Sequence, residues 1–393
     1  MTPPFARLGD VSTLITKGTT PTTIGYPFVD EGIPFLRAED INGGYVSVES
    51  AEKRISTECH KTLERSQLLA GDLLITIAGT VGRVGIAPTG EWSANCNQAV
   101  SIVRLKPEIF DLQFLCFFLR SGDVQHKFKQ QGTTATITNV SLAQIRNLEV
   151  PLLPLPEQRR IVDILSRAEG IVRLRREAQR KAAELIPGIF LDMFGDPATN
   201  PKGWPMSTIG HLTSVQTGAT PSRDNSAYYS DATIPWVKTG EVNGGIIPET
   251  EEMISQIALS ETNCKVFPVG TILVAMYGQG QTRGRSAVLG IPAATNQACA
   301  AILPSNNIDG AFLFCFLQTQ YEQLRGMAHG GNQANLNLSM IKGLPITLPP
   351  LSVQKVFSEK LDSVRSIQSQ QDAATAKGEA IFNALLAGVF TTD

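Results

Sequence analysis

Few side chains in this chain of 393 residues are spaced for catalysis. Its four histidines are isolated from one another, and none lies in a His-Glu-x-x-His zinc motif. No Gly-Lys dipeptide occurs, so a Walker A phosphate loop is absent, and Gly79, Gly82 and Gly85 lack the spacing of a dinucleotide-binding turn. The sequence also lacks an Asn-Pro-Pro-Tyr or Asp-Pro-Pro-Tyr segment and a serine nucleophile elbow. We therefore predict no catalytic residue, no cofactor and no metal site.

The cysteines and the hydropathy pattern indicate a cytoplasmic protein. Six cysteines are scattered without a Cys-x-x-Cys pair, which predicts reduced and buried thiols rather than disulfides or zinc ligands. The N-terminus lacks a basic segment followed by an apolar core, so we expect no signal peptide. The apolar run Phe110–Leu119 is too short to cross a bilayer, and no membrane association is expected.

The formal net charge of −2 gives no overall attraction to polyanions. Each segment of the chain taken separately is also close to neutral. Nucleic-acid binders usually present a basic patch. Any binding to nucleic acid must therefore come from locally clustered cations or from a basic partner.

The chain repeats itself after about 200 residues, which indicates a duplicated domain. The segment from Ile33 to Gly44 returns from Ile234 to Gly245, and Asn97–Ala99 returns as Asn296–Ala298. A phenylalanine-rich segment and a Leu-x-x-Gly-x-Phe segment return in the same order. This period is far longer than that of solenoid repeats, so it predicts two whole domains of one fold.

Each copy reads as a mixture of strands and helices, between α/β and α+β. Apolar runs bounded by Gly, Pro and Asn predict strands at 33–36, 72–78, 99–105 and 148–153. We expect Asp111 to cap a helix that carries Leu112 and Phe128, and Ser141 to cap a short helix. Either Asn337 or Ser339 begins the equivalent short helix of the second copy.

A long amphipathic helix is predicted after each copy. Between Ile161 and Leu185 apolar residues recur at three- and four-residue steps with basic residues between them, which indicates a helix of roughly 30 residues and roughly 45 Å. Pro187 and Gly188 are expected to end it. The second helix is expected from about Ser352 to Ala387.

Neither apolar stripe would be stable in water alone. Each helix could cover its own domain, but we favour pairing of the two as an antiparallel coiled coil that holds the domains at a fixed distance. The expected segments are a first domain at 1–156, the central helix at 157–200, a second domain at 201–350 and the C-terminal helix at 351–393.

Over essentially its whole length, the chain resembles the specificity subunits of type I restriction–modification systems. Each copy carries the Ile-Pro-Phe-Leu-Arg-x-x-Asp-Ile segment or a variant of it, and ends in a Leu-Pro-x-Pro-x-x-x-Gln type of segment, at Val150–Gln158 and Leu348–Gln354. The second copy departs from the pattern because Ser352-Val353 replaces Pro156-Glu157. We expect weaker local contacts there and the same role.

The resemblance implies two tandem target-recognition domains of mixed α/β fold, each reading one half of a bipartite, asymmetric site on double-stranded DNA. It implies that the helix pair sets the gap, with roughly 45 Å matching about 13 base pairs. Two adenine-N6 methyltransferase subunits would dock on the helices and flip the target bases. Whether two restriction subunits join them is left open. The resemblance also implies that the chain itself is not an enzyme.

Residues that both copies share are interpreted as scaffold, because two domains that read different sequences must differ where they touch the bases. We expect Arg37 and Lys238, and Asp40 and Glu241, to form packing contacts or salt bridges. The other shared positions are Pro34, Gly43, Gly44, Asn97, Gln98 and Leu119.

Loops that differ between the copies are the candidates for reading DNA. The loop Gly79–Arg83 corresponds to a longer one, Tyr277–Arg285, whose glutamines suit adenine and whose arginines suit guanine or phosphate. A second variable loop precedes the short helix, at Gly132–Thr136 and Gly330–Asn335. Both are rich in side chains that bond base edges or phosphates.

A third variable loop lies at Lys17–Pro21 and Thr217–Arg223. For each side chain on these loops the alternative is an ordinary solvated position. The predicted DNA-binding residues are Lys17, Thr19, Thr20, Thr80, Arg83, Thr133, Thr134, Thr136, Ser222, Arg223, Tyr277, Gln279, Gln281, Arg283, Arg285, Asn332, Gln333 and Asn335.

Three other functions are open to the sequence. A specificity subunit of a type II-like, fused nuclease–methyltransferase system would share the fold and differ in its partner. A self-sufficient methyltransferase or nuclease is disfavoured by the missing motifs. A purely structural scaffold would lack the salt-dependent DNA binding that phosphate contacts produce.

Overall fold

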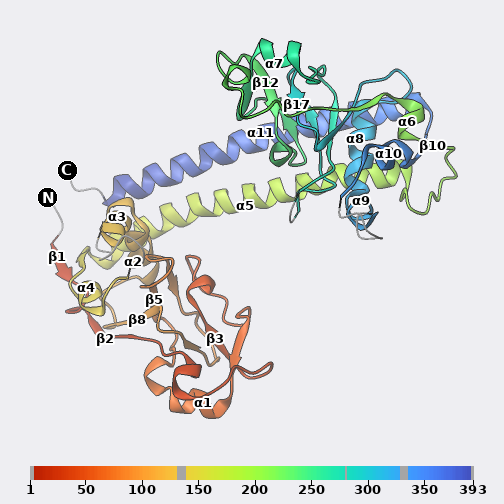
Figure 1. Cartoon of the computed structure of the whole chain (residues 1–393). Coiled ribbons are helices and arrows are strands. Elements are labelled where there is room, and N and C mark those ends of the chain that lie inside the picture. The colour runs from red at the N-terminus through yellow and green to blue at the C-terminus, as the bar shows by residue number, and fades with distance from the viewer. Residues whose placement is uncertain (1–3, 131–138, 279–280, 328–334, 391–393) are drawn as a thin grey trace. The chain divides into compact units, whose positions relative to one another are not determined.

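The chain folds into two compact units, each containing one copy of the repeat (Figure 1). The computed structural model describes residues 4–130, 139–278, 281–327 and 335–390. Unit 1 consists of residues 1–176 with 373–393, and unit 2 of residues 177–372.

Unit 1 is built on two small sheets. One has the strand order β2-β8-β5-β6 and is antiparallel throughout, and the other has the order β4-β3-β7 with β3 and β7 parallel. A two-stranded ribbon joins β1 to β9. The strands are β1 (Phe5–Arg7), β2 (Ser12–Lys17), β3 (Ile33–Leu36), β4 (Lys53–Ile55), β5 (Leu73–Thr76), β6 (Val84–Ile86), β7 (Asn95–Cys96), β8 (Val100–Leu105) and β9 (Glu149–Pro151), and the helices within the domain are α1 (Thr57–Thr62), α2 (Leu112–Arg120), α3 (Gly122–Gln130) and α4 (Leu142–Arg146).

Unit 2 repeats this plan with one more strand. Its larger sheet has the order β11-β18-β15-β16-β13, its smaller sheet the order β14-β12-β17, and its ribbon joins β10 to β19. The strands are β10 (Met206–Thr208), β11 (Val215–Thr217), β12 (Ile234–Val237), β13 (Ile246–Ile247), β14 (Glu252–Ile254), β15 (Ile272–Ala275), β16 (Ser286–Leu289), β17 (Ala294–Thr295), β18 (Cys299–Ile302) and β19 (Pro345–Thr347), and the helices within the domain are α6 (Ile209–Leu212), α7 (Gln256–Glu261), α8 (Gly310–Thr319), α9 (Tyr321–Met327) and α10 (Leu338–Gly343).

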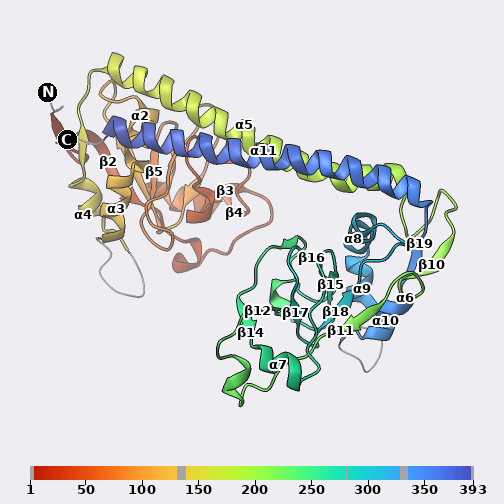
Figure 2. The same ribbon diagram turned by 90° about the horizontal axis from the view of Figure 1, so that it is seen from above.

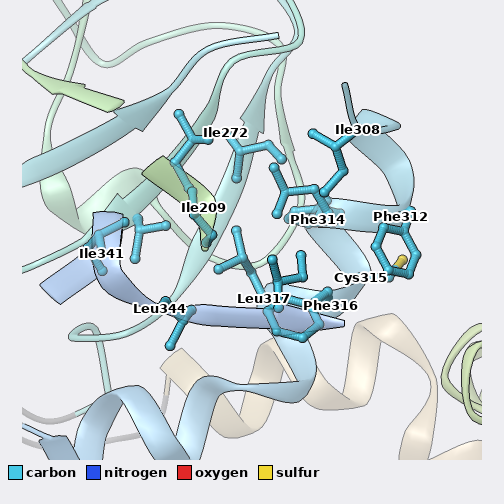
Figure 3. Close-up of a cluster of buried hydrophobic side chains, with 14 of the residues drawn as sticks. Ile209, Ile272, Ile308, Phe312, Phe314, Cys315, Phe316, Leu317, Ile341 and Leu344 are labelled. Carbon is cyan, nitrogen blue, oxygen red and sulfur yellow. The ribbon is translucent and has the colours of Figure 1, made fainter. Parts of the chain in front are cut away.

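The core of unit 2 lies between the larger sheet and helix α8. Figure 3 shows Ile272 of β15 facing Phe314 and Leu317 of α8, with Ile341 of α10 at the other side of the same cluster. All four side chains are almost fully buried. Strand β15 is buried on both faces, which explains why its sequence is a continuous apolar run rather than an alternating one.

Polar caps fix where the helices begin. The Asp111 carboxylate accepts hydrogen bonds from the backbone N–H groups of Gln113 and Phe114, as predicted for an N-cap. Ser141 caps α4 in a capping box with Gln144. In the second copy Asn337, not Ser339, is the cap of α10.

One expected helix is two helices. The sequence suggested a single helix carrying both Leu112 and Phe128, but α2 ends before Ser121, whose backbone is extended with φ −63° and ψ 153°. Helix α3 then begins at Gly122. The break lets Phe128 turn back into the core, where it is almost fully buried.

The shared charged residues that follow β3 and β12 form the expected contacts, and within each pair the bond runs from backbone to side chain. Asp40 accepts a hydrogen bond from the backbone N–H of Arg37 at 2.7 Å and so closes a 3₁₀ turn. The Arg37 guanidinium instead reaches Glu52, at 2.9 Å. The second copy repeats both contacts, from Lys238 N to Glu241 at 2.6 Å and from Lys238 Nζ to Glu251 at 2.8 Å.

Two long helices, α5 (Leu155–Phe194) and α11 (Leu351–Phe390), pair antiparallel, as predicted. In unit 1 they run side by side in both views (Figures 1 and 2), with Ile161 and Leu165 clustered against Leu386. Further along, the Arg176 guanidinium lies 2.6 Å from Glu379.

In unit 2 the other halves of the same helices meet. The Gln179 amide donates to Asp372 at 2.7 Å, and the Gln368 amide donates to the backbone carbonyl of Ala182 at 2.9 Å. Beyond these polar contacts, the ring centroids of Phe190 and Phe357 are 5.7 Å apart. Residue numbers rise along α5 as they fall along α11, which is the antiparallel order.

The expected end of the first long helix at Pro187 is wrong. A proline inside a helix removes one hydrogen bond and clashes with the preceding turn, which costs about 3 kcal/mol. Helix α5 continues nevertheless to Phe194 with Pro187 on its exposed side. Ile189 and Phe190 pack into the core of unit 2 beyond it, and this burial outweighs the local cost.

Candidate nucleic-acid interface

In unit 1 the variable loops leave one end of the larger sheet. Lys17 of β2 and Ile75 of β5 both lie opposite Ser101 of β8, and both strands run antiparallel to β8. The loops that follow β2 and β5 therefore leave the sheet at the same end, on either side of β8. Past the next variable segment, the Val140 N–H donates to the carbonyl of Ile77 at 2.9 Å. The register thus brings the starts of two variable loops, and the described residue Val140 that follows the third, to one end of the sheet.

Unit 2 reproduces this arrangement. Thr217 of β11 and Val274 of β15 both lie opposite Ala300 of β18. The Leu336 N–H donates to the carbonyl of Met276 at 3.1 Å, which ties the segment before α10 to the end of β15. The strands of the larger sheet therefore have the same register in both units, and the loops that leave them differ in sequence.

An arginine closes the loop between the two central strands in each unit. The Thr76 N–H donates to the carbonyl of Arg83 at 2.9 Å, and the Ala275 N–H donates to the carbonyl of Arg285 at 2.9 Å. The loop of unit 2 is longer, yet both loops are closed by the same bond at the same point of the sheet. Arg83 and Arg285 therefore occupy equivalent backbone positions.

The two closing arginines are held by different acceptors. Arg83 Nη1 donates to the side-chain oxygen of Asn42 at 3.1 Å. Arg285 Nη2 donates to the side-chain oxygen of Gln281 at 2.9 Å. The backbone carbonyl of Gln281 in turn accepts from the Tyr321 hydroxyl at 2.7 Å.

The loops after β2 and β11 pass very close to the backbone at the ends of β7 and β17. A Cβ atom on Gly18 would collide with the carbonyl oxygen of Cys96, and one on Gly218 with that of Thr295, so only glycine fits at either position. Lys17, just before this close approach, is exposed.

Two threonines in this loop make the same contact in both copies. Thr20 donates its hydroxyl hydrogen to the Gln98 side chain, and Thr220 donates to that of Gln297. Because residues shared by both copies were interpreted as scaffold, this repetition ranks Thr20 below its neighbours as a base reader.

Arg223 is fixed on an aromatic surface in unit 2. Its guanidinium lies 4.4 Å from the ring centroid of Tyr229 and 5.5 Å from that of Trp236, and it pairs with Glu252 at 2.6 Å. Hydrogen bonding to Arg223 lowers the pKa of the Glu252 carboxyl, and the nearby charges of Arg223 and Lys238 act in the same direction. The guanidinium therefore has a defined position while its side chain stays 55% exposed.

The predicted residues that the structure describes are all at least partly accessible. Six of the eighteen, Thr133, Thr134, Thr136, Gln279, Asn332 and Gln333, lie outside the described residues. Exposed are Lys17, Thr80, Ser222, Arg223, Tyr277, Gln281 and Asn335, and half-buried are Thr19, Thr20, Arg83, Arg283 and Arg285.

Basic residues on helix α3 belong to the same surface and were missed from the sequence. The amide of Gln125 in α3 donates to the carbonyl of Gly82 at 2.8 Å, so α3 packs on the loop that Arg83 closes. Lys127 and Lys129 are exposed in the last turn of this helix, which leads into a variable loop. The sequence feature that could have pointed to them is the pair of lysines directly before the variable loop.

The described residues hold no group of three or more His, Cys, Asp or Glu side chains that would bind a metal ion. Within the same part of the chain, no helix is long and apolar enough to span a membrane.

Comparisons with known proteins identify the two units. The model of the type I restriction modification DNA specificity domain matches residues 5–183 and again residues 201–374. The specificity subunit of the type I restriction enzyme MjaIX from Methanocaldococcus jannaschii is 21% identical over 365 residues, covering 87% of this chain and 82% of that protein.

Solved structures share the fold. A chain from a structural study of assembly and conformational transition in a type I restriction–modification system matches with a TM-score of 0.66 at 19% identity, covering 100% of both chains. The S subunit of a type I restriction–modification system from M. genitalium matches with a TM-score of 0.57 at 15% identity, again covering 100% of both. With the specificity-domain model matched twice and over most of its length, this chain belongs to the family of type I restriction–modification specificity proteins.

Proposed function

We propose that this chain is the DNA-recognition subunit of a type I restriction–modification complex, and that each unit reads one half of a bipartite site on double-stranded DNA. The observation that carries the proposal is that, in each unit, two variable loops begin at one end of an equivalent sheet, and the described residue after the third, Val140 or Leu336, is bonded to the same end. A common frame would present each unit to the DNA in the same way, and different loops would make the two units read different bases.

Locally clustered cations supply the attraction to phosphate that the net charge does not. In unit 1 the loop end carries Lys17 and Arg83, with Lys127 and Lys129 on the adjoining helix. Such a cluster makes affinity for DNA fall steeply with salt.

Two adenine methyltransferase subunits are the partners we propose for the paired helices, which set the gap between the half-sites. Apolar side chains remain uncovered there: Ile171 is 52% and Leu174 60% exposed on α5 in unit 1, and Ile367 is 49% exposed on α11 in unit 2. Uncovered apolar side chains on an otherwise polar helix are typical of a protein contact. Restriction subunits would join through this cytoplasmic assembly, and the chemistry would lie entirely on the partners.

The first experiment is co-expression with the cognate methyltransferase subunit in a host that lacks adenine methylation, followed by genome-wide mapping of N6-methyladenine. We expect a single bipartite motif with a fixed gap. Methylation at a continuous motif would overturn the two-reader proposal. So would the absence of methylation from a soluble, associated complex.

Variants then assign the half-sites. Arg283→Ala or Arg285→Ala should relax the sequence read in the second half-site alone, because a base-reading arginine contributes roughly 1–3 kcal/mol of discrimination. Relaxation of both half-sites by either variant would contradict separate readers.

Docking is tested on the helices. Leu174→Glu should prevent co-purification of the methyltransferase subunit, since it places a charge in the apolar contact. Ser366→Glu adds the same charge at an exposed polar position of α11 and should leave co-purification intact. Equal effects of the two variants would argue against docking at Leu174.

A further inference from the structure

We propose that Arg83 and Arg285 are equivalent guanine-reading arginines, and that Asn42 and Gln281 are the residues that position them. The inference rests on the proposed DNA-reading function and goes beyond it by assigning a base and two positioning residues.

The equivalence of the two arginines follows from the backbone on both sides of them. Each follows a glycine in the left-handed region, Gly82 with φ +89° and Gly284 with φ +85°. The N–H of Gly82 donates to the carbonyl of Thr76 at 2.9 Å, and that of Gly284 to the carbonyl of Ala275 at 2.8 Å. The bonds from the Thr76 N–H to the Arg83 carbonyl and from the Ala275 N–H to the Arg285 carbonyl are also equal, at 2.9 Å. The extra residues of the longer loop therefore lie before Gly284.

Helices α3 and α9 back the two glycines in the same way. A Cβ atom on Gly82 would approach the ring of Phe128 to 3.2 Å, and one on Gly284 would approach Cβ of Leu324 to 3.4 Å. The backbone that bears each arginine is therefore pressed against a helix, and the arginine side chains start from the same place in both units.

The acceptors that hold these arginines are different in origin. Asn42 lies on the turn after β3, and its counterpart in the repeated segment is Asn243. Arg285 nevertheless bonds Gln281, a residue of its own loop. Asn243 lies with Arg285 on the wall of a pocket of about 300 Å³ and makes no described hydrogen bond to it. One arginine is thus positioned by a residue of the turn after β3, and the other by a residue of its own loop.

Gln281 is itself held in place. The Tyr321 hydroxyl donates to its backbone carbonyl at 2.7 Å. The guanidinium of Arg325 lies 5.4 Å from the centroid of the Tyr321 ring. Helix α9 therefore sets the position of the acceptor that aims Arg285.

An arginine that is held by an amide oxygen can still bind guanine. The amide oxygen accepts from one of the five guanidinium N–H groups and does not neutralise the charge. Among the described residues, neither Arg83 nor Arg285 forms an ion pair, whereas Arg37 and Arg223 are paired with glutamates. Guanine offers O6 and N7 side by side in the major groove, and a guanidinium with two adjacent free donors matches them.

The test uses the intact complex with its methyltransferase subunit and maps N6-methyladenine for three variants. Gln281→Leu should relax one guanine position of the second half-site, and Asn42→Leu one guanine position of the first. Asn243→Leu is the matched control, because it removes the same amide from the equivalent turn in unit 2. It should change neither half-site.

A binding measurement separates base reading from phosphate contact. On duplexes carrying the mapped motif, replacing the assigned guanine by 7-deazaguanine removes the N7 acceptor and should weaken binding of the unaltered complex roughly tenfold. The Gln281→Leu complex should lose little on the same replacement, and Arg285→Lys should behave likewise. Thermal unfolding and co-purification with the methyltransferase subunit establish that each variant is folded.

Three outcomes would overturn the inference. Unchanged motifs for Gln281→Leu and Asn42→Leu would exclude the positioning role. A uniform loss of affinity that is insensitive to 7-deazaguanine would make these arginines phosphate contacts. A bipartite motif from the unaltered complex together with either result would leave the proposed function standing. A complex that methylates no bipartite motif would overturn both.

Discussion

The side-chain oxygen of Gln158 accepts a hydrogen bond from the backbone N–H of Asp111 at 2.8 Å. This bond ties the first turn of α5 to the cap of α2. In unit 2 the side-chain oxygen of Gln354 accepts from the N–H of Asp309 at the same distance. Both glutamines are fully buried. The glutamine that ends each Leu-Pro-x-Pro type of segment therefore fastens a long helix to the domain that precedes it.

Replacing this glutamine should loosen the joint. Gln158→Leu keeps the volume but leaves the Asp111 N–H and the carbonyls of Ile109 and Leu153 without their partner. We expect a loss of about 1–3 kcal/mol in unfolding free energy, and faster amide exchange in α2. Gln370→Leu, at an exposed position of α11, is the control and should change neither. Unaltered exchange in the Gln158 variant would contradict the anchoring role.

The end of α5 should depend on a single ring. The Phe194 centroid lies 4.8 Å from that of Phe312 and 5.3 Å from that of Phe357. Phe194→Ala should destabilise unit 2 by about 3–5 kcal/mol, because it leaves a cavity in a closed core. Leu191→Ala, on the exposed side of the same turn, should cost less than about 0.5 kcal/mol. Denaturant unfolding that showed equal losses would argue that the helix end is not pinned.

The Arg223–Glu252 pair should make unit 2 sensitive to acid. Because Arg223 lowers the pKa of the Glu252 carboxyl in the folded protein, the pair stabilises the fold above the unfolded carboxyl pKa of about 4.3. This contribution is lost as the pH falls through the lowered folded value. The stability difference between the unaltered protein and Glu252→Gln, measured from pH 7 down to pH 3, should therefore shrink at the acid end. In an Arg223→Gln background the same substitution should show a weaker trend, because only Lys238 then lowers the pKa of the Glu252 carboxyl.

The six thiols should be unreactive in the folded protein. All are buried, and burial raises the pKa of each of them, that of Cys315 to about 11. Since the thiolate is the nucleophile, labelling with iodoacetamide at pH 8 should be slow and should accelerate only on unfolding. Rapid labelling of any one cysteine would show that its surroundings open locally.

Much of the architecture could be predicted from the sequence because it is carried by local patterns. Strand β5 and the capped helix α2 follow from an apolar run and from Asp111, and the helix pairing follows from the two apolar stripes. The break at Ser121 was missed because its cause is tertiary, namely the burial of Phe128. The passage of α5 through Pro187 was missed for the same reason.

The candidate site was predictable only as a set of loops. Variation between the copies pointed to the segments around Thr80 and Tyr277, but it placed Arg83 and Arg285 among the differences. Their equivalence depends on backbone bonds between residues that loops of unequal length separate, and no sequence pattern records these. The hydrogen bond from Arg83 to Asn42 joins residues that are 41 positions apart in the chain.

The bonds that close the Arg83 and Arg285 loops bear on how such a protein acquires a new target. Strand register is fixed on the sheet side of these bonds, and a slip by one residue there would turn every core side chain outward. Beyond them, lengthening a loop costs only a fraction of a kcal/mol in closure entropy. Insertions and deletions can therefore place a different side chain at the tip while the sheet stays unchanged. On the proposed reading of DNA by these loops, loop length as well as residue identity would change the specificity of each domain separately.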